Sequence, residues 1–472
     1  MRQALETEQK ALEINLDPSL YGTLAEIGAG QEVARNFFAV GAAAGTIAKT
    51  MSAYDKVVSD DIYGPEPSGR YVCESRLYKM LDHEWGLMER RLRQNRPDTN
   101  FFVFADTVAT LNYQRTIKGD GWLGIRFQLK PDTRPNDLVL HVKMLDNDTQ
   151  LQQQAIGILG VNLVYACFRY ADQPEVMLQS LMDSLQGRVK IDMVRLTGPD
   201  FNHLDNRLLS LWLVKNGLTE VAMFDHNGNN VHASEFLYKK NVMVVRASFR
   251  PPTLLDADMI RTGFEQFRHE PGVDPSRIHL LTEMTLRILS EDGQIDEEDF
   301  LARADLLGAL GHTVVVSSCE KYQQLINYLA DYKVQNLGLV LRSHRLLNFM
   351  SETYYQNVEG RLLAAFGEVF VKNVKLYTYP TQQEGSEEPM TAANLPVPEG
   401  LTFLYRHLLD NRQIVDIETF NPEVLSIYSP EILSQIRQGL TGWEDKLPAE
   451  VARLIKSKYL FGFPTERLEF EY

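Results

Sequence analysis

The densest run of polar side chains able to do chemistry follows a short predicted strand near the middle of the chain. Asp225, His226 and Asn227 come directly after the apolar residues 221–224. An Asp can orient a His for proton transfer, and an Asn beside a Gly turn can hold a sugar or a phosphate. Ligands of open parallel sheets bind outside the carboxyl ends of the strands, so this position favours a functional site. The alternative is a plain turn, because Asn-Gly and Asp-His are favoured there.

Other polar residues end further predicted strands. Arg246 ends one strand, Ser317 and Ser318 end another, and Arg342 follows a third and opens a helix. An arginine at such a position can bind an anionic group, although arginines at helix starts also form weak surface ion pairs. We therefore predict Asp225 and His226 as a catalytic pair. The predicted ligand-binding residues are Asn227, Arg246, Ser317, Ser318 and Arg342.

Motifs of common named enzymes are missing from the chain. It contains no GxSxG, HExxH or GxGxxG sequence and no protein-kinase set. The three cysteines, Cys73, Cys167 and Cys319, are far apart and fit neither a disulfide framework nor a CxxC pair. We predict no metal site, and the sequence does not identify a cofactor. The cysteine usage favours a reducing compartment such as the cytoplasm.

Charge and hydropathy narrow the classes of partner. The chain has 472 residues with 48 Lys+Arg against 63 Asp+Glu, a net charge of −15 that repels a phosphate backbone. Nucleic-acid binding is therefore not expected. The longest apolar stretch, residues 155–168, is shorter than a membrane span, and residues 1–10 lack the pattern of a signal peptide. We predict no membrane insertion and a cytoplasmic location.

The predicted site residues lie at the ends of strands that alternate with helices along the sequence. This alternation predicts an α/β fold with a mainly parallel sheet. We expect two βα units, joined near Arg250-Pro251-Pro252 because two prolines cannot continue a strand ladder. An α-helical segment precedes them and a helical tail follows. The predicted boundaries are 1–97 for the helical N-terminal segment, 98–252 and 253–380 for the α/β units, 381–400 for a linker, and 401–472 for the helical C-terminal tail.

Two terminal features favour assembly. Gly41 and Gly45, four apart in a small-residue segment, predict a helix face that lets another helix approach closely, with an anion-binding loop as the alternative. The sequence Tyr459-Leu-Phe-Gly-Phe-Pro464 is an aromatic tail, which usually docks on its own chain or on a neighbour. We therefore expect a homo-oligomer formed through the N- and C-terminal helical segments.

The N-terminal sequence resembles a poorly characterised bacterial family. The likeness is carried by Leu12-Glu-Ile-Asn-Leu-Asp-Pro18, by Gly22-Thr-Leu-Ala-Glu-Ile-Gly-Ala-Gly-Gln-Glu-Val-Ala34 and by Ala44-Gly-Thr-Ile-Ala-Lys-Thr-Met-Ser-Ala-Tyr-Asp55, and it extends over most of the chain. Proteins of this kind are described either as nicotinate-nucleotide adenylyltransferases or as TonB-dependent receptors. The first description implies nucleotide binding and transfer of an adenylyl group.

The motifs of such adenylyltransferases are incompletely present. This chain has no GxFxPxHxGH sequence, and Val316-Ser-Ser-Cys-Glu-Lys-Tyr322 matches an ISSTxxR motif at its serines only. The leading hypothesis is therefore a cytosolic self-assembling or partner-binding protein without recognisable catalytic machinery. The alternative is an enzyme that binds a nucleotide or a small phosphorylated metabolite, of which an adenylyltransferase is one form.

Overall fold

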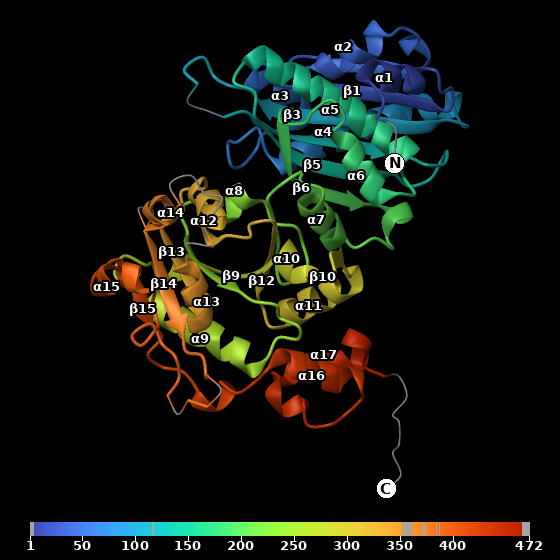
Figure 1. The fold of residues 1–472 in the computed structure, drawn as a ribbon. Coiled ribbons are helices and arrows are strands. Elements are labelled where there is room, and N and C mark those ends of the chain that lie inside the picture. Colours follow the sequence, from blue (N-terminus) through green and yellow to red (C-terminus); the bar gives the residue numbers. More distant parts are fainter. Residues whose placement is uncertain are drawn as a thin grey trace. The chain divides into compact units, whose positions relative to one another are not determined.

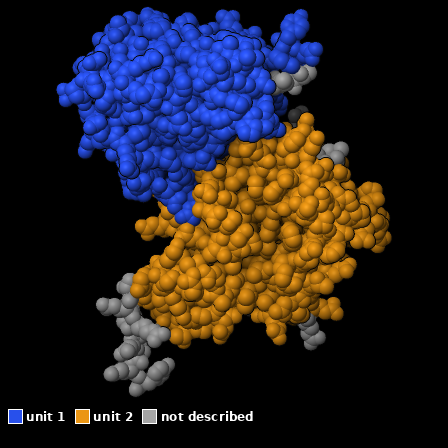
Figure 2. Space-filling model, turned by 180° about the vertical axis from the view of Figure 1, so that it is seen from behind, with its two compact units in different colours: residues 1–220 blue, residues 221–472 orange. Residues whose placement is uncertain are grey.

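The computed structural model describes residues 4–115, 118–351, 354, 361–370, 373–383, 385–386 and 388–464. The chain divides into two compact units, residues 1–220 and 221–472 (Figures 1 and 2). Each unit has its own sheet covered by helices. The α/β class predicted from the sequence is thereby confirmed.

Unit 1 contains a six-stranded sheet in the order β2-β1-β3-β4-β5-β6. Its strands are β1 (Leu20–Ile27), β2 (Ile47–Ser52), β3 (Asn100–Ala109), β4 (Asp120–Phe127), β5 (Asn136–Met144) and β6 (Val189–Thr197). The first three strands run parallel, whereas β3 to β6 pair antiparallel. The mainly parallel sheet expected for residues 98–252 is wrong here, because short connections without a helix join β3, β4 and β5.

Helices cover both faces of the unit 1 sheet (Figure 1). They are α1 (Thr7–Asn15), α2 (Glu32–Ala39), α3 (Lys56–Tyr63), α4 (Glu74–Leu92), α5 (Thr149–Arg169), α6 (Pro174–Leu181) and α7 (Asn206–Lys215). Phe102 and Phe104 of β3 face the layer containing α1, α2 and α5, while Phe101 and Val103 face α4. This alternation follows from the two-residue period of a strand.

Helix α5 is the one described helix long and apolar enough to cross a membrane. Most of its apolar window, 72%, is buried inside the protein. Gly157 and Gly160 lie where α5 packs on α2, and a Cβ atom on Gly160 would stand 2.3 Å from Val33 Cγ2. These contacts place α5 in the core of unit 1.

The predicted all-helical segment 1–97 is wrong, because it supplies β1 and β2 to the sheet. Strand β1 is buried on both faces and so lacks the alternation that identifies a half-exposed strand. Gly41 and Gly45 do not form a helix face either. Gly41 has φ +80 in a loop, and Gly45 ends the short turn Ala43–Gly45 before β2.

Unit 2 contains a seven-stranded sheet in the order β15-β14-β13-β8-β9-β12-β7. The strands are β7 (Val221–Phe224), β8 (Asn241–Arg246), β9 (Ile278–Thr285), β12 (Thr313–Ser317), β13 (Asn336–Arg342), β14 (Val374–Tyr379) and β15 (Ile414–Asp416), with a separate small hairpin of β10 (Ser290–Glu291) and β11 (Gln294–Ile295). Every neighbouring pair is parallel except β7 with β12.

Helices again lie on both faces of the unit 2 sheet. They are α8 (Ala233–Phe236), α9 (Leu254–Arg268), α10 (Leu286–Leu289), α11 (Glu297–Ala309), α12 (Tyr322–Ala330), α13 (Ser343–Phe349), α14 (Arg361–Phe370), α15 (Thr402–Asp410), α16 (Ser429–Arg437) and α17 (Ala449–Lys458). Helices α12, α13 and α14 share a core with β8 and β13, and α9 packs against the same strands from the other side. The long helix expected from Ser343 to Phe366 ends at Phe349, and most of residues 352–360 lie outside the described residues.

The boundaries differ from the predicted ones. Strands β7 and β8 pair with strands of the second half, so the chain divides after Glu220 rather than near residue 252. The segment 381–400 is not a free linker in its described part, because Ala392 is fully buried and its carbonyl accepts from the Tyr405 hydroxyl at 2.7 Å. The 401–472 segment also contributes a strand, β15, besides its helices.

The C-terminal helices pack on their own unit. Trp443 and Phe461 are buried with Leu306 of α11 and residues of α16 and α17. The aromatic tail therefore docks on its own chain, one of the two outcomes expected from the sequence.

Candidate functional site

A cavity of about 1120 Å³ opens at the carboxyl edge of the parallel strands in unit 2. It lies where the strand order reverses, because β9 flanks β8 on one side and the later strand β13 flanks it on the other. Arg246 at the end of β8, Thr285 at the end of β9 and Arg342 at the end of β13 all line it. Such crevices are the usual ligand sites of open α/β sheets.

Arg342 brings a positive charge into this cavity. Its buried Nε atom has no hydrogen-bond partner, and the side chain forms no ion pair among the described residues. Burial lowers the pKa of the guanidinium and the charge of Arg345 adds to this effect, while Asp256 opposes it. An arginine nevertheless stays protonated in proteins. The result is a partly buried cation without a matching anion.

Two exposed arginines extend the positive surface. Arg287 after β9 and Arg345 in α13 line the same cavity, and neither forms an ion pair with another described residue. The described lining also holds Arg246 and only two acids, Asp256 and Glu320. The cavity is thus basic in a chain of net charge −15.

Arg246 forms the wall of the cavity and is already neutralised. Its Nε and Nη2 atoms donate to the two carboxylate oxygens of Glu283, at 2.8 and 3.0 Å, and Glu283 is fully buried. The Tyr322 ring lies over the guanidinium at 4.3 Å from its centroid. Ser317 donates to the same carboxylate at 2.5 Å. This group fixes the ends of β8, β9 and β12 relative to one another.

His344 lies beside Arg342 on the cavity lining. Its Nδ1 atom is 3.2 Å from the Thr381 hydroxyl. Burial, followed by the charges of Arg342 and Arg345, lowers the pKa of this imidazole to about 4. His344 is therefore neutral near pH 7.

The start of α9 closes another side of the cavity. Thr253 and Asp256 form a capping box, in which the Asp256 carboxylate accepts from the Thr253 backbone amide and hydroxyl, both at 2.8 Å. Burial raises the pKa of Asp256, although these hydrogen bonds oppose the shift. The capping box fixes where the 15-residue helix begins, and its N-terminal end carries a partial positive charge.

Apolar and aromatic side chains complete the lining. They are Leu255, Met259, Ile288, Tyr322, Leu341, Phe349, Tyr354, Ile427 and Tyr428. The Tyr354 hydroxyl donates to the Glu320 carbonyl and accepts from the Tyr322 amide, both at 3.3 Å. A cavity with arginines, a helix start and aromatic walls can hold an anion attached to a larger organic group.

The predicted residues Asp225, His226 and Asn227 lie elsewhere. Strand β7 runs antiparallel to β12, so its carboxyl end lies at the edge of the sheet opposite to the cavity. The Asp225 carboxylate accepts from the backbone amides of Asn227 and Asn229, at 2.9 and 2.8 Å, and so closes its own turn. The grouping of these residues with Arg246 is wrong. The turn interpretation explains their contacts.

The other predicted residues lie at the carboxyl edge of the parallel strands, as expected, but only some of them line the cavity. Arg246 and Arg342 line the cavity, whereas Ser317 is buried against Glu283 and neither Ser317 nor Ser318 lines it. Thr253 and Asp256 also line the cavity and are not among the residues predicted from the sequence. Their Thr-x-x-Asp spacing directly after two prolines is a capping-box signal that was present in the sequence.

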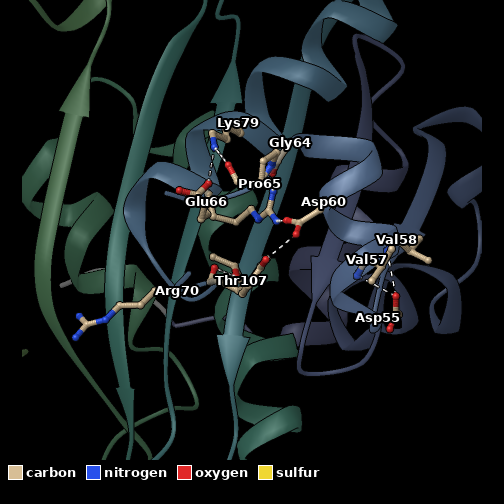
Figure 3. A network of polar contacts seen from close by, with 12 residues as sticks. Asp55, Val57, Val58, Asp60, Gly64, Pro65, Glu66, Arg70, Lys79 and Thr107 are labelled. Atoms are coloured by element: carbon tan, nitrogen blue, oxygen red, sulfur yellow. Dashed lines mark hydrogen bonds and ion pairs between the residues drawn. The ribbon is translucent and has the colours of Figure 1, made fainter. Parts of the chain in front are cut away.

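A second polar network lies in unit 1 (Figure 3). The fully buried Arg76 donates to the Asp60 carboxylate at 2.8 Å and to the Gly64 carbonyl at 2.6 Å. Tyr71 donates to Asp60 at 2.7 Å and accepts, through its carbonyl, from Thr107 of β3. These contacts tie the segment between α3 and α4 to the sheet, and the charges of Arg76 and Asp60 neutralise each other.

Comparisons with known proteins include distant likenesses to solved structures. No family model and no curated protein matches the chain. A competence/damage-inducible protein of Agrobacterium tumefaciens is 15% identical, with 35% of this chain and 98% of that protein covered at a TM-score of 0.25. A competence-damaged superfamily protein of Klebsiella pneumoniae is 11% identical over 34% and 98% of the two chains, with a TM-score of 0.26. A proposed nicotinate-nucleotide adenylyltransferase of Vibrio parahaemolyticus is 12% identical over 48% and 97%, with a TM-score of 0.20.

Proposed function

We propose that unit 2 binds a small organic anion, of sugar-phosphate to nucleotide size, in the cavity at the carboxyl edge of its sheet. The observation that carries this proposal is Arg342, whose buried Nε atom lacks an acceptor. Burying a cation without a partner destabilises the folded state. A bound anion would supply the missing partner, and Arg287 and Arg345 would add further attraction.

Two further features support an anionic ligand. The start of α9 adds the partial positive charge of a helix N-terminus, which attracts anions, although the Thr253 and Asp256 amides are already hydrogen-bonded in the capping box. The cavity also lies at the switch point where ligands of such sheets bind. The two acids of the lining, Asp256 and Glu320, are outnumbered by Arg287, Arg342 and Arg345, so its net charge stays positive.

The size and walls of the cavity support an organic ligand rather than a bare ion. A volume of about 1120 Å³ is comparable with the largest cavities that bind drug-sized molecules. Tyr354 and Tyr428 offer aromatic surface for a base or another planar group. We limit the proposal to binding, because the catalytic pair predicted from the sequence, Asp225 and His226, lies at the other edge of the sheet.

The test measures binding of phosphate, pyrophosphate, sugar phosphates and nucleotides to two proteins. These are the wild-type full chain and its Arg342→Met variant. Thermal unfolding detects binders, because a ligand that binds only the folded state raises Tm. Calorimetric titration then gives Kd for each binder. We expect Arg342→Met to weaken binding at least about tenfold, which is roughly 1.4 kcal/mol, without lowering Tm in the absence of ligand.

Arg268→Met provides the matched control. Arg268 is in the last turn of α9, far along the helix from the cavity, and forms an exposed pair with Glu265. The Arg268→Met substitution removes one positive charge at a residue that does not line the cavity, so the Kd should equal that of the wild type. Equal Kd values for Arg342→Met and the wild type would overturn the proposal.

We further propose a cytoplasmic homo-oligomer, as expected from the sequence. All three cysteines are free and buried, which supports a reducing compartment. The support for assembly comes from exposed apolar side chains, among them Tyr54, Val57 and Val58 near the start of α3.

A further inference from the structure

Burial and two neighbouring arginines keep His344 neutral near pH 7. Arg342 precedes it and Arg345 follows it in the chain, and both charges act on its imidazole. From the segment after β14, the Thr381 hydroxyl lies at 3.2 Å from Nδ1. A hydroxyl can donate to a neutral imidazole nitrogen or accept from a protonated one. The imidazolium form can therefore be accommodated without moving Thr381.

The remaining charged and titratable groups around this corner are few. From α9, the Asp256 carboxylate acts on Arg342 and is itself held by Thr253. From β14, the Tyr379 phenol acts on Arg342 and donates to Asp258 at 2.7 Å. Asp258 also accepts from Arg261. Among these groups, the two arginines are the charges that act on the His344 imidazole and oppose its protonation.

We propose that His344 takes up a proton when an anion occupies the cavity, so that the site binds its ligand more tightly as the pH falls. This inference rests on the proposed anion binding by Arg342 and Arg345. An anion beside these arginines cancels the repulsion that they exert on an imidazolium and adds an attraction of its own. By linkage, a ligand that favours protonation binds better to the protonated protein.

The ligand gains a specific contact in the same step. A neutral imidazole offers only one N–H, whereas the protonated ring donates from both nitrogens. Where the neutral ring carries its proton on Nδ1 and donates it to the Thr381 hydroxyl, protonation places an additional N–H on Nε2. In that tautomer, Nε2 changes from an acceptor into a charge-assisted donor to the anion.

The test follows His344 itself by NMR of the full chain with isotope-labelled histidines. The chain has 10 histidines, and the signal lost in His344→Gln identifies the residue. The pH is varied from 4 to 8 in inorganic sulfate and, separately, in sodium chloride of equal ionic strength. Sulfate is the probe because it carries two charges throughout this range. We expect sulfate to raise the pKa of His344 by at least about one unit, a tenfold change in proton affinity.

His312 is the matched control within the same spectrum. Burial alone lowers the pKa of His312, which immediately precedes β12 and so lies at the opposite edge of the sheet. Sulfate should leave its titration as it is in chloride. A parallel rise at both histidines would show a general salt effect and would overturn the inference.

Thermal unfolding separates failure of the inference from failure of the proposed function. If sulfate stabilises the wild type but not Arg342→Met, and the His344 titration is nevertheless the same in both salts, the cavity binds anions without proton uptake at His344. If sulfate gives no stabilisation that depends on Arg342 at any pH, the proposed anion site falls and the inference falls with it. If sulfate raises the pKa of His344 alone and stabilises the protein only when Arg342 is present, the result supports both the proposed anion site and proton uptake at His344. Reading the imidazole directly also excludes Asp256 as the source of the change.

Discussion

Arg246 and Arg342 end neighbouring parallel strands, yet their charges are used differently. Arg246 is paired on two atoms with the fully buried Glu283 and is covered by Tyr322. Arg342 has no such acid. Arg246 therefore stabilises the carboxyl edge of the sheet, whereas Arg342 is available to a ligand. Replacing each of them should accordingly affect different properties.

Arg246→Met should destabilise the folded protein strongly. The change leaves the Glu283 carboxylate buried without its cation, which costs about 3–5 kcal/mol for a buried pair. Urea unfolding followed by circular dichroism measures this loss. Arg268→Met breaks an exposed pair and should cost less than about 1 kcal/mol. Similar losses for the two variants would contradict the assigned role of Arg246.

The sequence was sufficient to place Arg246 and Arg342 but not the Asp225 turn. Both arginines follow strands with a helix on either side in sequence, and such strands run parallel, so their ends meet. The direction of β7 is not encoded in its four residues, because a short edge strand can add to a sheet either way round. The lack of a hydrogen-bond partner at Arg342 Nε also depends on which groups surround it in space. No residue spacing could reveal that.

At the level of single elements, a pair of acids is buried between two parallel strands of unit 1. Glu26 of β1 and Asp106 of β3 are register partners, and the Asp106 Oδ2 atom has no hydrogen-bond partner. Glu26 accepts from the Val33 and Ala34 amides at the start of α2, at 2.9 and 3.0 Å. Burial raises the pKa of Glu26 to about 7 despite these bonds, and burial together with Glu26 raises that of Asp106.

Glu26→Gln should reduce the pH dependence of stability. The folded protein holds a proton on Glu26 more tightly than the unfolded chain, so stability falls as the pH rises from about 4.5 through 7. The loss is about 2–3 kcal/mol for a shift of this size. Glutamine cannot ionise and still accepts one of the two amide hydrogen bonds. The variant should therefore lose less stability than the wild type between pH 5 and pH 8.

Urea unfolding at the two pH values gives this difference. Glu8→Gln, which changes an exposed acid in the first turn of α1, serves as the control and should keep the wild-type dependence. An identical loss of stability in Glu26→Gln and Glu8→Gln would contradict the raised proton affinity of Glu26.

Most strands after residue 100 could be predicted because their apolar runs are bounded by turns and separated by helices. Strands β1 and β2 could not. In β1, Gly22 lies against the Phe102 ring, where a Cβ atom would stand 2.4 Å from Cζ. A small residue required by this close contact interrupts the sequence pattern of a strand. The C-terminal strand β15 is only three residues long and gives no pattern at all.

On the scale of the whole molecule, each unit has a complete sheet and its own core. We expect residues 1–220 to fold alone, with a cooperative urea transition by circular dichroism. A fragment of residues 1–252 should be less soluble, because it carries β7 and β8 without their partners in the unit 2 sheet. Absence of a cooperative transition in the 1–220 fragment would contradict this independence.

Self-assembly stays a prediction, and the molar mass of the protein in solution tests it. We expect light scattering of the full chain at micromolar concentration to give a multiple of 53.9 kDa. Changing Val57 and Val58 to Ser should reduce that mass, because both are exposed apolar residues of the N-terminal segment. Deleting residues 1–60 is unsuitable, since it removes β1 and β2 from the sheet. A wild-type mass of 53.9 kDa would exclude assembly.

The docking of the C-terminal helices has an optical consequence. Of the four tryptophans, Trp85, Trp122 and Trp212 belong to unit 1, and Trp443 is the one in unit 2. Trp443 is fully buried, with its indole N–H on the Leu440 carbonyl and its ring against Phe463. With the other three tryptophans changed to Phe, the wavelength of the Trp443 emission maximum would report whether α16 and α17 are packed against α11. The chain thus carries its own fluorescent probe of that contact.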